Sequence, residues 1–98
     1  MATYIATLKF STTGASHINE TIDRAAAFRA DAEKMGISVV GQYWTSGPAD
    51  GVLIFDAPDE TTATAALLHL ASKGNVETTT ARAYTADEMK AALGKLSG

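Results

Sequence analysis

The residues with the most chemical potential in this chain lie in one segment, YWTSGPADGVLIFDA, which runs from Tyr43 to Ala57. The carboxylate of Asp50 closes its Gly–Pro turn, and a phenol and an indole, Tyr43 and Trp44, precede it. In an apolar cavity, a carboxylate with a perturbed pKa serves as a general base or anchors a ligand. In a hairpin, it accepts hydrogen bonds from backbone amides and stabilises the turn. We favour the turn role for Asp50 and keep the general base as the alternative.

Tyr43 and Trp44 are neighbours in a predicted strand, so their side chains point to opposite faces of a sheet. At most one of them therefore faces a ligand, and packing against the core or another subunit is the favoured role for both. We expect any binding site to be built from Tyr43, Trp44, Asp50, Thr80 and Arg82.

Arg82 and Thr80 share the threonine-rich face of the last predicted strand. The guanidinium of Arg82 suits a substrate carboxylate, and an ion pair between subunits with Glu77 or Asp50 explains it equally well.

No motif of the sequence indicates a metal or a cofactor. The chain has no cysteine, and His17 and His69 lack the spacing of a metal-binding pair, so we interpret both as surface residues. The sequence contains no Gly-x-Ser-x-Gly elbow, no glycine-rich phosphate loop and no dinucleotide-binding fingerprint.

The composition and net charge of the chain argue against some classes of partner. A net charge of −3 and scattered basic residues argue against nucleic acid and anionic membranes. No apolar stretch approaches the roughly 20 residues that span a bilayer, and MATYIATLKF does not resemble a signal peptide, so we expect a cytoplasmic protein. The 98 residues form one domain whose alanine-rich core gives a small stability margin, for which oligomerisation would compensate.

Hydrophobic periodicity and turn residues predict the order β-α-β-β-α-β followed by a helix. The predicted strands are Thr3–Phe10, Ile37–Thr45, Gly51–Ala57 and Val76–Thr85. The first helix begins near Thr21 as N-cap and ends at Gly36, with one face formed by Ile22, Ala25, Phe28, Ala32 and Met35.

The remaining helical features concern charges and caps. Arg29 is expected to pair with Glu33 one turn later, or alternatively to reach a carboxylate at an interface. The second helix covers Glu60–Ser72 after Asp59 as N-cap, with His69 and Leu68 on its outer face. Thr85 and Glu88 form a capping box before the last helix.

This order predicts an α+β, ferredoxin-like fold in which a four-stranded antiparallel sheet carries both long helices on one face. The other face would be bare, although the first three strands carry apolar residues on both faces. A bare apolar face of that size needs a cover. We therefore expect face-to-face homodimers or higher oligomers, with an apolar space between the sheets for a small apolar or aromatic ligand.

The ordered segments TYIATLKFSTTG, TIDRA, YWTSG, VLIFDAPDE and GNVETTTARAYT resemble the GYD domain family, a group of small dimeric α/β-barrel proteins. The resemblance covers nearly the whole chain and implies one ferredoxin-like domain over residues 1–98. In the family's Gly-x-Tyr-Asp turn, Gly47 and Asp50 match the ends, whereas Ala49 stands where the family has tyrosine. Asp56 stands where a glutamate is common.

Two functions remain. The first is a small-molecule-binding or assembly module that uses the space between the sheets. The alternative is a cofactor-independent isomerase or monooxygenase that acts on a small aromatic or apolar metabolite, with Asp50 as the base. Two polar groups converging in a cavity would favour the enzyme.

Overall fold

The computed structural model describes residues 1–96. Four strands are present: β1 (Ala2–Phe10), β2 (Ser38–Trp44), β3 (Gly51–Ala57) and β4 (Val76–Ala83). The helices are α1 (Thr12–Ser16), a 3-10 turn η1 (Ile18–Glu20), α2 (Thr21–Lys34), α3 (Glu60–Ser72) and α4 (Ala86–Gly94). The predicted element order is therefore confirmed, with two short helical segments added before α2.

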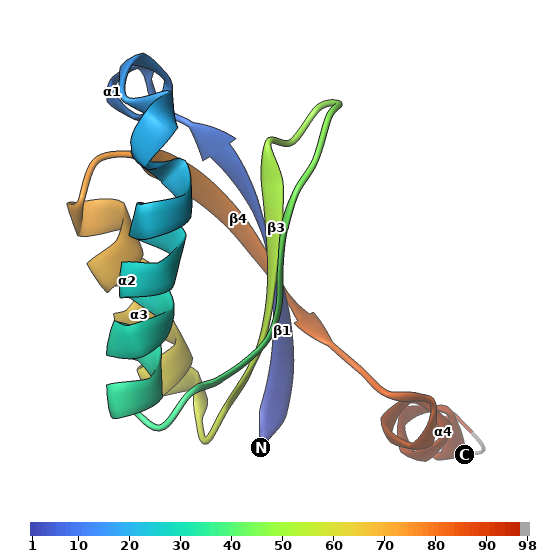
Figure 1. The fold of residues 1–98 in the computed structure, drawn as a ribbon. Helices are drawn as coiled ribbons and strands as arrows, with labels where there is room; N and C mark the ends of the chain where they lie inside the picture. Colours follow the sequence, from blue (N-terminus) through green and yellow to red (C-terminus); the bar gives the residue numbers. More distant parts are fainter. Residues whose placement is uncertain (97–98) are drawn as a thin grey trace.

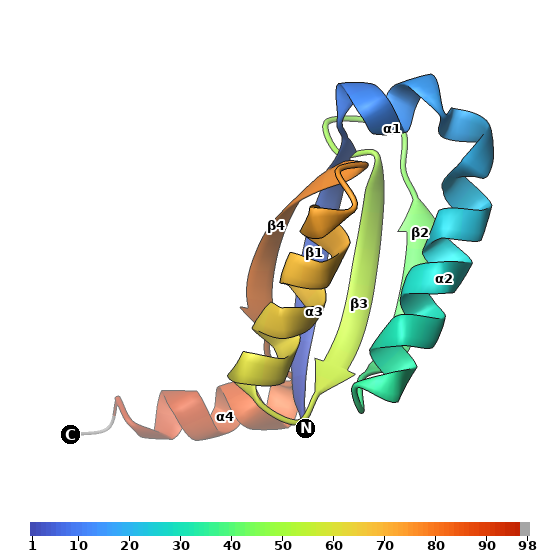
Figure 2. The same ribbon diagram turned by 90° about the vertical axis from the view of Figure 1, so that its left-hand side faces the viewer.

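The strands form one antiparallel sheet in the order β2-β3-β1-β4, as in ferredoxin-like folds. β1 lies in the interior of the sheet because both of its edges are paired, to β3 and to β4. Helices α2 and α3 lie side by side on one face of this sheet, and no helix covers the opposite face (Figures 1 and 2). We call this second surface the open face.

The core lies between the sheet and the two helices. Phe55 on β3 is its largest fully buried side chain, and it stacks against Tyr4 of β1 at 5.4 Å between ring centroids. Small residues on the helices, including Ala32, Ala63 and Ala66, allow the helices to approach these rings closely. Tyr4 and Ala6 of β1 lie on the same face of the strand and are both buried in this core.

The entry into α2 differs from the prediction. The hydroxyl of Ser11 caps α1 by accepting a hydrogen bond from the Gly14 amide, and Glu20, rather than Thr21, occupies the N-cap position of α2. Ile22 was expected on the buried face but is 68% exposed. At the first turn of α2 the helix has only just reached the sheet, so a periodic pattern places Ile22 on a face with nothing to cover it.

The ends of the other helices follow the predictions. Asp59 caps α3, and Thr85 with Glu88 forms the capping box of α4. Arg29 lies 3.5 Å from Glu33, as expected, and also donates a hydrogen bond to the carbonyl of Val39. Helix α4 lies beyond one end of the sheet and covers none of it (Figures 1 and 2).

Candidate functional site

The open face has an apolar centre and polar ends. The strand register places Gly41, Ile54, Ile5 and Ala81 in one row across all four strands. The adjacent row contains Tyr43, Val52, Thr7 and Thr79. We call these eight residues the central rows.

The polar ends lie on either side of the central rows. At one end the hydroxyl of Thr3 donates a 2.5 Å hydrogen bond to Asp56, and at the other Lys9 is paired in register with Glu77. An apolar centre inside a polar rim is the pattern of protein interfaces. Tyr43 is 59% exposed, as is Val40, which follows the buried Val39 and points to the other face.

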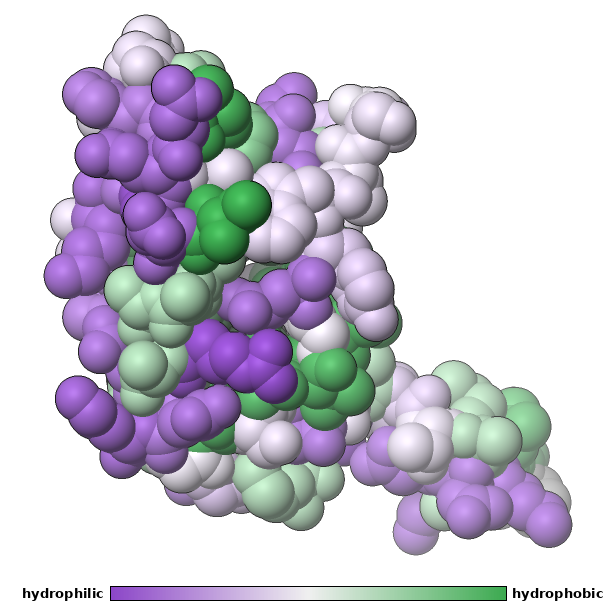
Figure 3. Space-filling view, viewed as in Figure 1, coloured by the Kyte–Doolittle hydropathy of each residue, from purple (hydrophilic) through white to green (hydrophobic). Residues whose placement is uncertain are grey.

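Helix α4 presents a second uncovered apolar surface. Met89, Leu93 and Leu96 are spaced at i, i+4 and i+7, and all three are exposed. In the space-filling view α4 stands apart from the body of the domain (Figure 3). A nine-residue helix is marginal in water by itself, and none of its residues is buried against the described part of its own chain.

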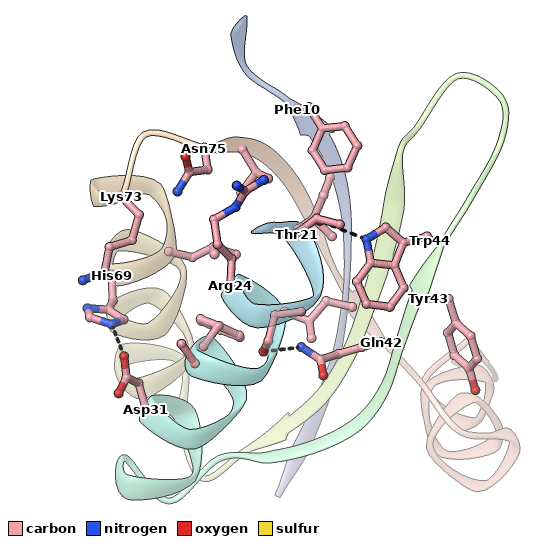
Figure 4. Close-up of a pocket in the computed structure, with 17 residues that line it drawn as sticks. Phe10, Thr21, Arg24, Asp31, Gln42, Tyr43, Trp44, His69, Lys73 and Asn75 are labelled. Atoms are coloured by element: carbon pink, nitrogen blue, oxygen red, sulfur yellow. Dashed lines mark hydrogen bonds and ion pairs between the residues drawn. The ribbon is translucent and has the colours of Figure 1, made fainter. Parts of the chain in front are cut away.

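The two aromatic candidates are separated by the sheet, as the alternation predicts. Tyr43 lies on the open face, where its ring covers the Cα of Gly41 so closely that a Cβ there would lie 2.7 Å from it. Trp44 lies on the helix side and donates a hydrogen bond from its indole nitrogen to the Thr21 hydroxyl at 3.0 Å (Figure 4).

Asp50 is held by the backbone. Its carboxylate accepts a hydrogen bond from the amide of Phe10 at 2.9 Å, and its own amide donates to the carbonyl of Leu8 at 2.8 Å. These two bonds tie the β2–β3 turn to the end of β1. Gly47 in this turn has a φ of 145°, which favours glycine.

Thr80 and Arg82 occupy the helix side of β4, because their register partners Ala6 and Tyr4 are buried there. They therefore do not lie on the open face with Tyr43. Arg82 binds Glu88 of α4 at 2.9 Å, and its guanidinium lies over the ring of Tyr84. Within residues 1–96, the carboxylate partner of Arg82 is thus Glu88 of its own chain.

This ion pair joins α4 to the sheet and perturbs both groups. The pKa of Glu88 lies below its ordinary value because the amide of Thr85 donates a hydrogen bond to the carboxylate and Arg82 donates a second. The pKa of Arg82 is raised by the hydrogen bond to Glu88. Both effects favour the charged forms that hold the base of α4 in place.

A cavity of about 240 Å³ lies on the helix side, between α2, α3 and the sheet (Figure 4). Trp44 lines it, and Tyr43 lies at its edge with the ring pointing away. Asp50, Thr80 and Arg82 do not line this cavity. The structure therefore does not gather the five predicted site residues in one place.

His69 corrects a prediction. It was expected on the outer face of α3, but it is half-buried and bonds Asp31 of α2 at 2.8 Å across the two helices. This contact lowers the pKa of Asp31 below its ordinary value, chiefly through the hydrogen bond. His17 is exposed and bonded locally to Ser16 and Thr13, as expected for a surface residue. Within residues 1–96, no three histidine, aspartate or glutamate side chains gather closely enough to hold a metal ion.

Comparison with known families identifies the domain. The sequence matches the GYD domain family over residues 4–93, which is nearly the whole chain. The chain is a GYD domain protein. The resemblance carried by its ordered segments is thereby confirmed.

Two known proteins show how far the similarity extends. This GYD protein is 34% identical over 94 residues to the glutamine synthetase and cystathionine beta-lyase binding protein of Thermus thermophilus, covering 95% of this chain and 99% of that one. The crystal structure of MtbAldR superposes with a TM-score of 0.66 over 86% of this chain and 53% of the other, at 14% identity. The second likeness concerns the fold alone, and this chain spans about half of that protein. No helix in the described part of the GYD protein has the length and apolar character to cross a membrane.

Proposed function

We propose that this GYD protein is a cytoplasmic, homodimeric binding module that pairs through its open face and attaches to metabolic enzymes. The observation that supports the pairing is the open face itself. It has a continuous apolar row across four strands, and no helix within residues 1–96 covers it.

The chemistry of the open face favours a second copy of the chain as the cover. Two identical faces related by a two-fold axis bring the central rows together and set the polar ends against each other. Thr3 and Asp56 already satisfy one another at one end, so pairing leaves no buried carboxylate without a donor there. At the other end, Lys9 and Glu77 offer both signs of charge to the partner.

The exposed side of α4 supports the same arrangement. The helix projects from the end of the sheet rather than folding back on it (Figure 1). Met89, Leu93 and Leu96 would be covered if α4 packed against the partner subunit, which would also give this short helix the tertiary support it needs. The pair Arg82–Glu88 and the capping box hold the base of the helix for that contact.

Attachment to enzymes is supported by the relative from Thermus thermophilus, whose name states that it binds glutamine synthetase and cystathionine beta-lyase. The similarity extends over almost the full length of both chains, so the two proteins share the whole domain rather than one motif. We propose that this chain likewise binds one of these two enzymes.

Biolayer interferometry tests the attachment. The GYD protein is immobilised and exposed to purified glutamine synthetase, to purified cystathionine beta-lyase and to an unrelated oligomeric enzyme of similar net charge. We expect saturable binding to at least one of the first two and none to the control. Binding to neither, or equal binding to all three, contradicts the proposed partner.

The alternative function, a cofactor-independent enzyme with Asp50 as base, lacks a supporting observation. The carboxylate of Asp50 accepts the Phe10 amide and lies outside the cavity that Trp44 lines. The binding module is therefore the function that the geometry favours.

A further inference from the structure

The cavity on the helix side has an apolar interior that the chain leaves unfilled. Its interior is formed by one end of the core: Leu8, Phe10, Leu53, Phe28, Leu70 and Val76. Leu53 and Phe28 are buried, but the other four are only half-buried. At the opposite end of the same core, Tyr4, Phe55 and Ala57 are fully packed.

The reason for the gap lies in α2. Ala25 and Ala27 line the cavity, where larger side chains would fill it. A natural core is packed to about the density of an organic crystal, so a persistent apolar gap of this size indicates room for a ligand. The cavity is smaller than the roughly 300–1,000 Å³ of drug-sized sites, which limits the ligand to a small molecule.

Arg24 places a positive charge at one end of this cavity. Its side chain is only 22% exposed and is oriented by two backbone carbonyls, those of His17 at 2.8 Å and Gly14 at 3.3 Å. A guanidinium has five N–H donors, and these two bonds use two of them. Glu20 is 3.8 Å away, a looser ion pair.

The local backbone holds Arg24 in this position. Gly14 approaches Asn75 so closely that a Cβ on Gly14 would lie 2.0 Å from the Asn75 carbonyl oxygen. Ser11 bonds the same loop through its amide to Asn75 and its hydroxyl to Gly74. Helix α1 is therefore docked on the α3–β4 loop. The carbonyls of Gly14 in α1 and of His17 just after it hold the guanidinium near Asn75, which also lines the cavity (Figure 4).

Among the residues that line the cavity, Arg24 and Lys73 are formally positive and Asp31 is negative. Lys73 adds a second formal cation at the rim. An anionic ligand head is therefore attracted to the Arg24 end, while the Asp31 carboxylate is hydrogen-bonded to His69.

We propose that this cavity binds a small amphiphilic carboxylate, with its apolar body against Leu8, Leu70 and Val76 and its carboxylate on the Arg24 guanidinium. This site is separate from the open face, on the other side of the sheet, and does not depend on the proposed pairing. The chemistry is common to short fatty acids and to aryl-substituted acids, and the experiment distinguishes these two sources.

Trp44 provides the readout, because it is the single tryptophan of the chain and lines the cavity. Its fluorescence is titrated with octanoate, with 3-phenylpropanoate and with the neutral 1-octanol. We expect a saturable change with at least one acid, at an affinity about tenfold or more above that of 1-octanol, as a charge-assisted hydrogen bond provides. The acid that binds with the higher affinity shows whether the site prefers short fatty acids or aryl-substituted acids.

Two variants and a matched control locate the site. Arg24→Gln should weaken acid binding about tenfold or more with little effect on 1-octanol. Ala25→Leu fills the cavity and should abolish binding of all three probes while leaving the far-ultraviolet circular dichroism unchanged. Arg29→Gln removes an exposed arginine of the same helix that does not line the cavity, and should bind like the native protein.

Three results would overturn the proposal: no saturable change with either acid, 1-octanol binding as tightly as the acids, or unchanged affinity in both Arg24→Gln and Ala25→Leu. If Arg24→Gln fails to fold, two measurements still test the proposal: binding to Ala25→Leu, and the comparison of the acids with 1-octanol in the native protein.

Discussion

Neighbouring residues of strand β3 point to opposite faces of the sheet. Phe55 points to the helices and is 1% exposed, while Ile54 lies on the open face and is only half-buried by residues 1–96. Both are large and apolar. The sequence of this strand therefore provides for two packed faces, of which the chain closes one. The second copy proposed for the open face would complete the second one.

The helix-covered face should be the more sensitive to loss of volume. Phe55→Ala removes the largest fully buried side chain together with its stacking on Tyr4. We expect the free energy of unfolding to fall by about 3–5 kcal/mol, measured by urea denaturation. Thr79→Ala, on the open face, should change it by less than about 0.5 kcal/mol. A loss below about 1 kcal/mol for Phe55→Ala would contradict the description of the core.

The open face should be sensitive to charge in its effect on assembly. Ile54→Asp places a carboxylate in the central rows of both subunits, and we expect each copy to lose about 2 kcal/mol or more of association free energy. Sedimentation equilibrium measures the shift toward monomer. Leu68→Asp, an exposed apolar residue of α3 outside the sheet, is the control and should remain dimeric. A dimer that survives Ile54→Asp unchanged rules out pairing through this face.

Helix α4 should contribute less to the interface. Leu93→Glu charges the exposed apolar side of the helix, and we expect association to weaken by about 1–2 kcal/mol per copy as apolar contact is lost. Ala91→Glu lies on the opposite side of α4 and should associate normally. If the two substitutions weaken association equally, the apolar side of α4 makes no specific contact with the partner subunit.

The smallest effect concerns pH and the base of α4. The pKa of Glu88 is lower in the folded protein than its ordinary value of 4.5, so the unfolded chain binds more protons in acid. The stabilisation is complete above pH 4.5 and is lost as pH falls through the lowered pKa of the folded state. Glu88→Gln should therefore show a shallower decline of unfolding free energy between pH 7 and about pH 3, measured by urea denaturation. An unchanged decline would contradict the role of the Arg82–Glu88 pair.

Most of the fold could be predicted because local signals agree with one another. The caps at Asp59 and Thr85 each depend on nearby residues, and both are confirmed. The entry into α2 was predicted less well. Ser11 caps an extra helix whose five residues are too few for a periodic pattern, and its docking depends on Asn75, far along the chain.

The candidate sites depended on side chains that meet only in the folded molecule. The alternation correctly separates Tyr43 from Trp44, but it does not show that Arg82 reaches forward to Glu88. The cavity arises from alanines of α2 that face half-buried residues of β1, β4 and α3. In the sequence, Ala25 and Ala27 look like any small residues of a helix. The contact of His69 with Asp31 depends likewise on how the two helices lie together.

Light scattering of the native protein at low micromolar concentration tests the central claim most directly. A second copy over the open face predicts at least twice the 10.2 kDa mass of one chain. A folded protein that remains at 10.2 kDa under these conditions would show that the central rows stay in water, and would contradict the account.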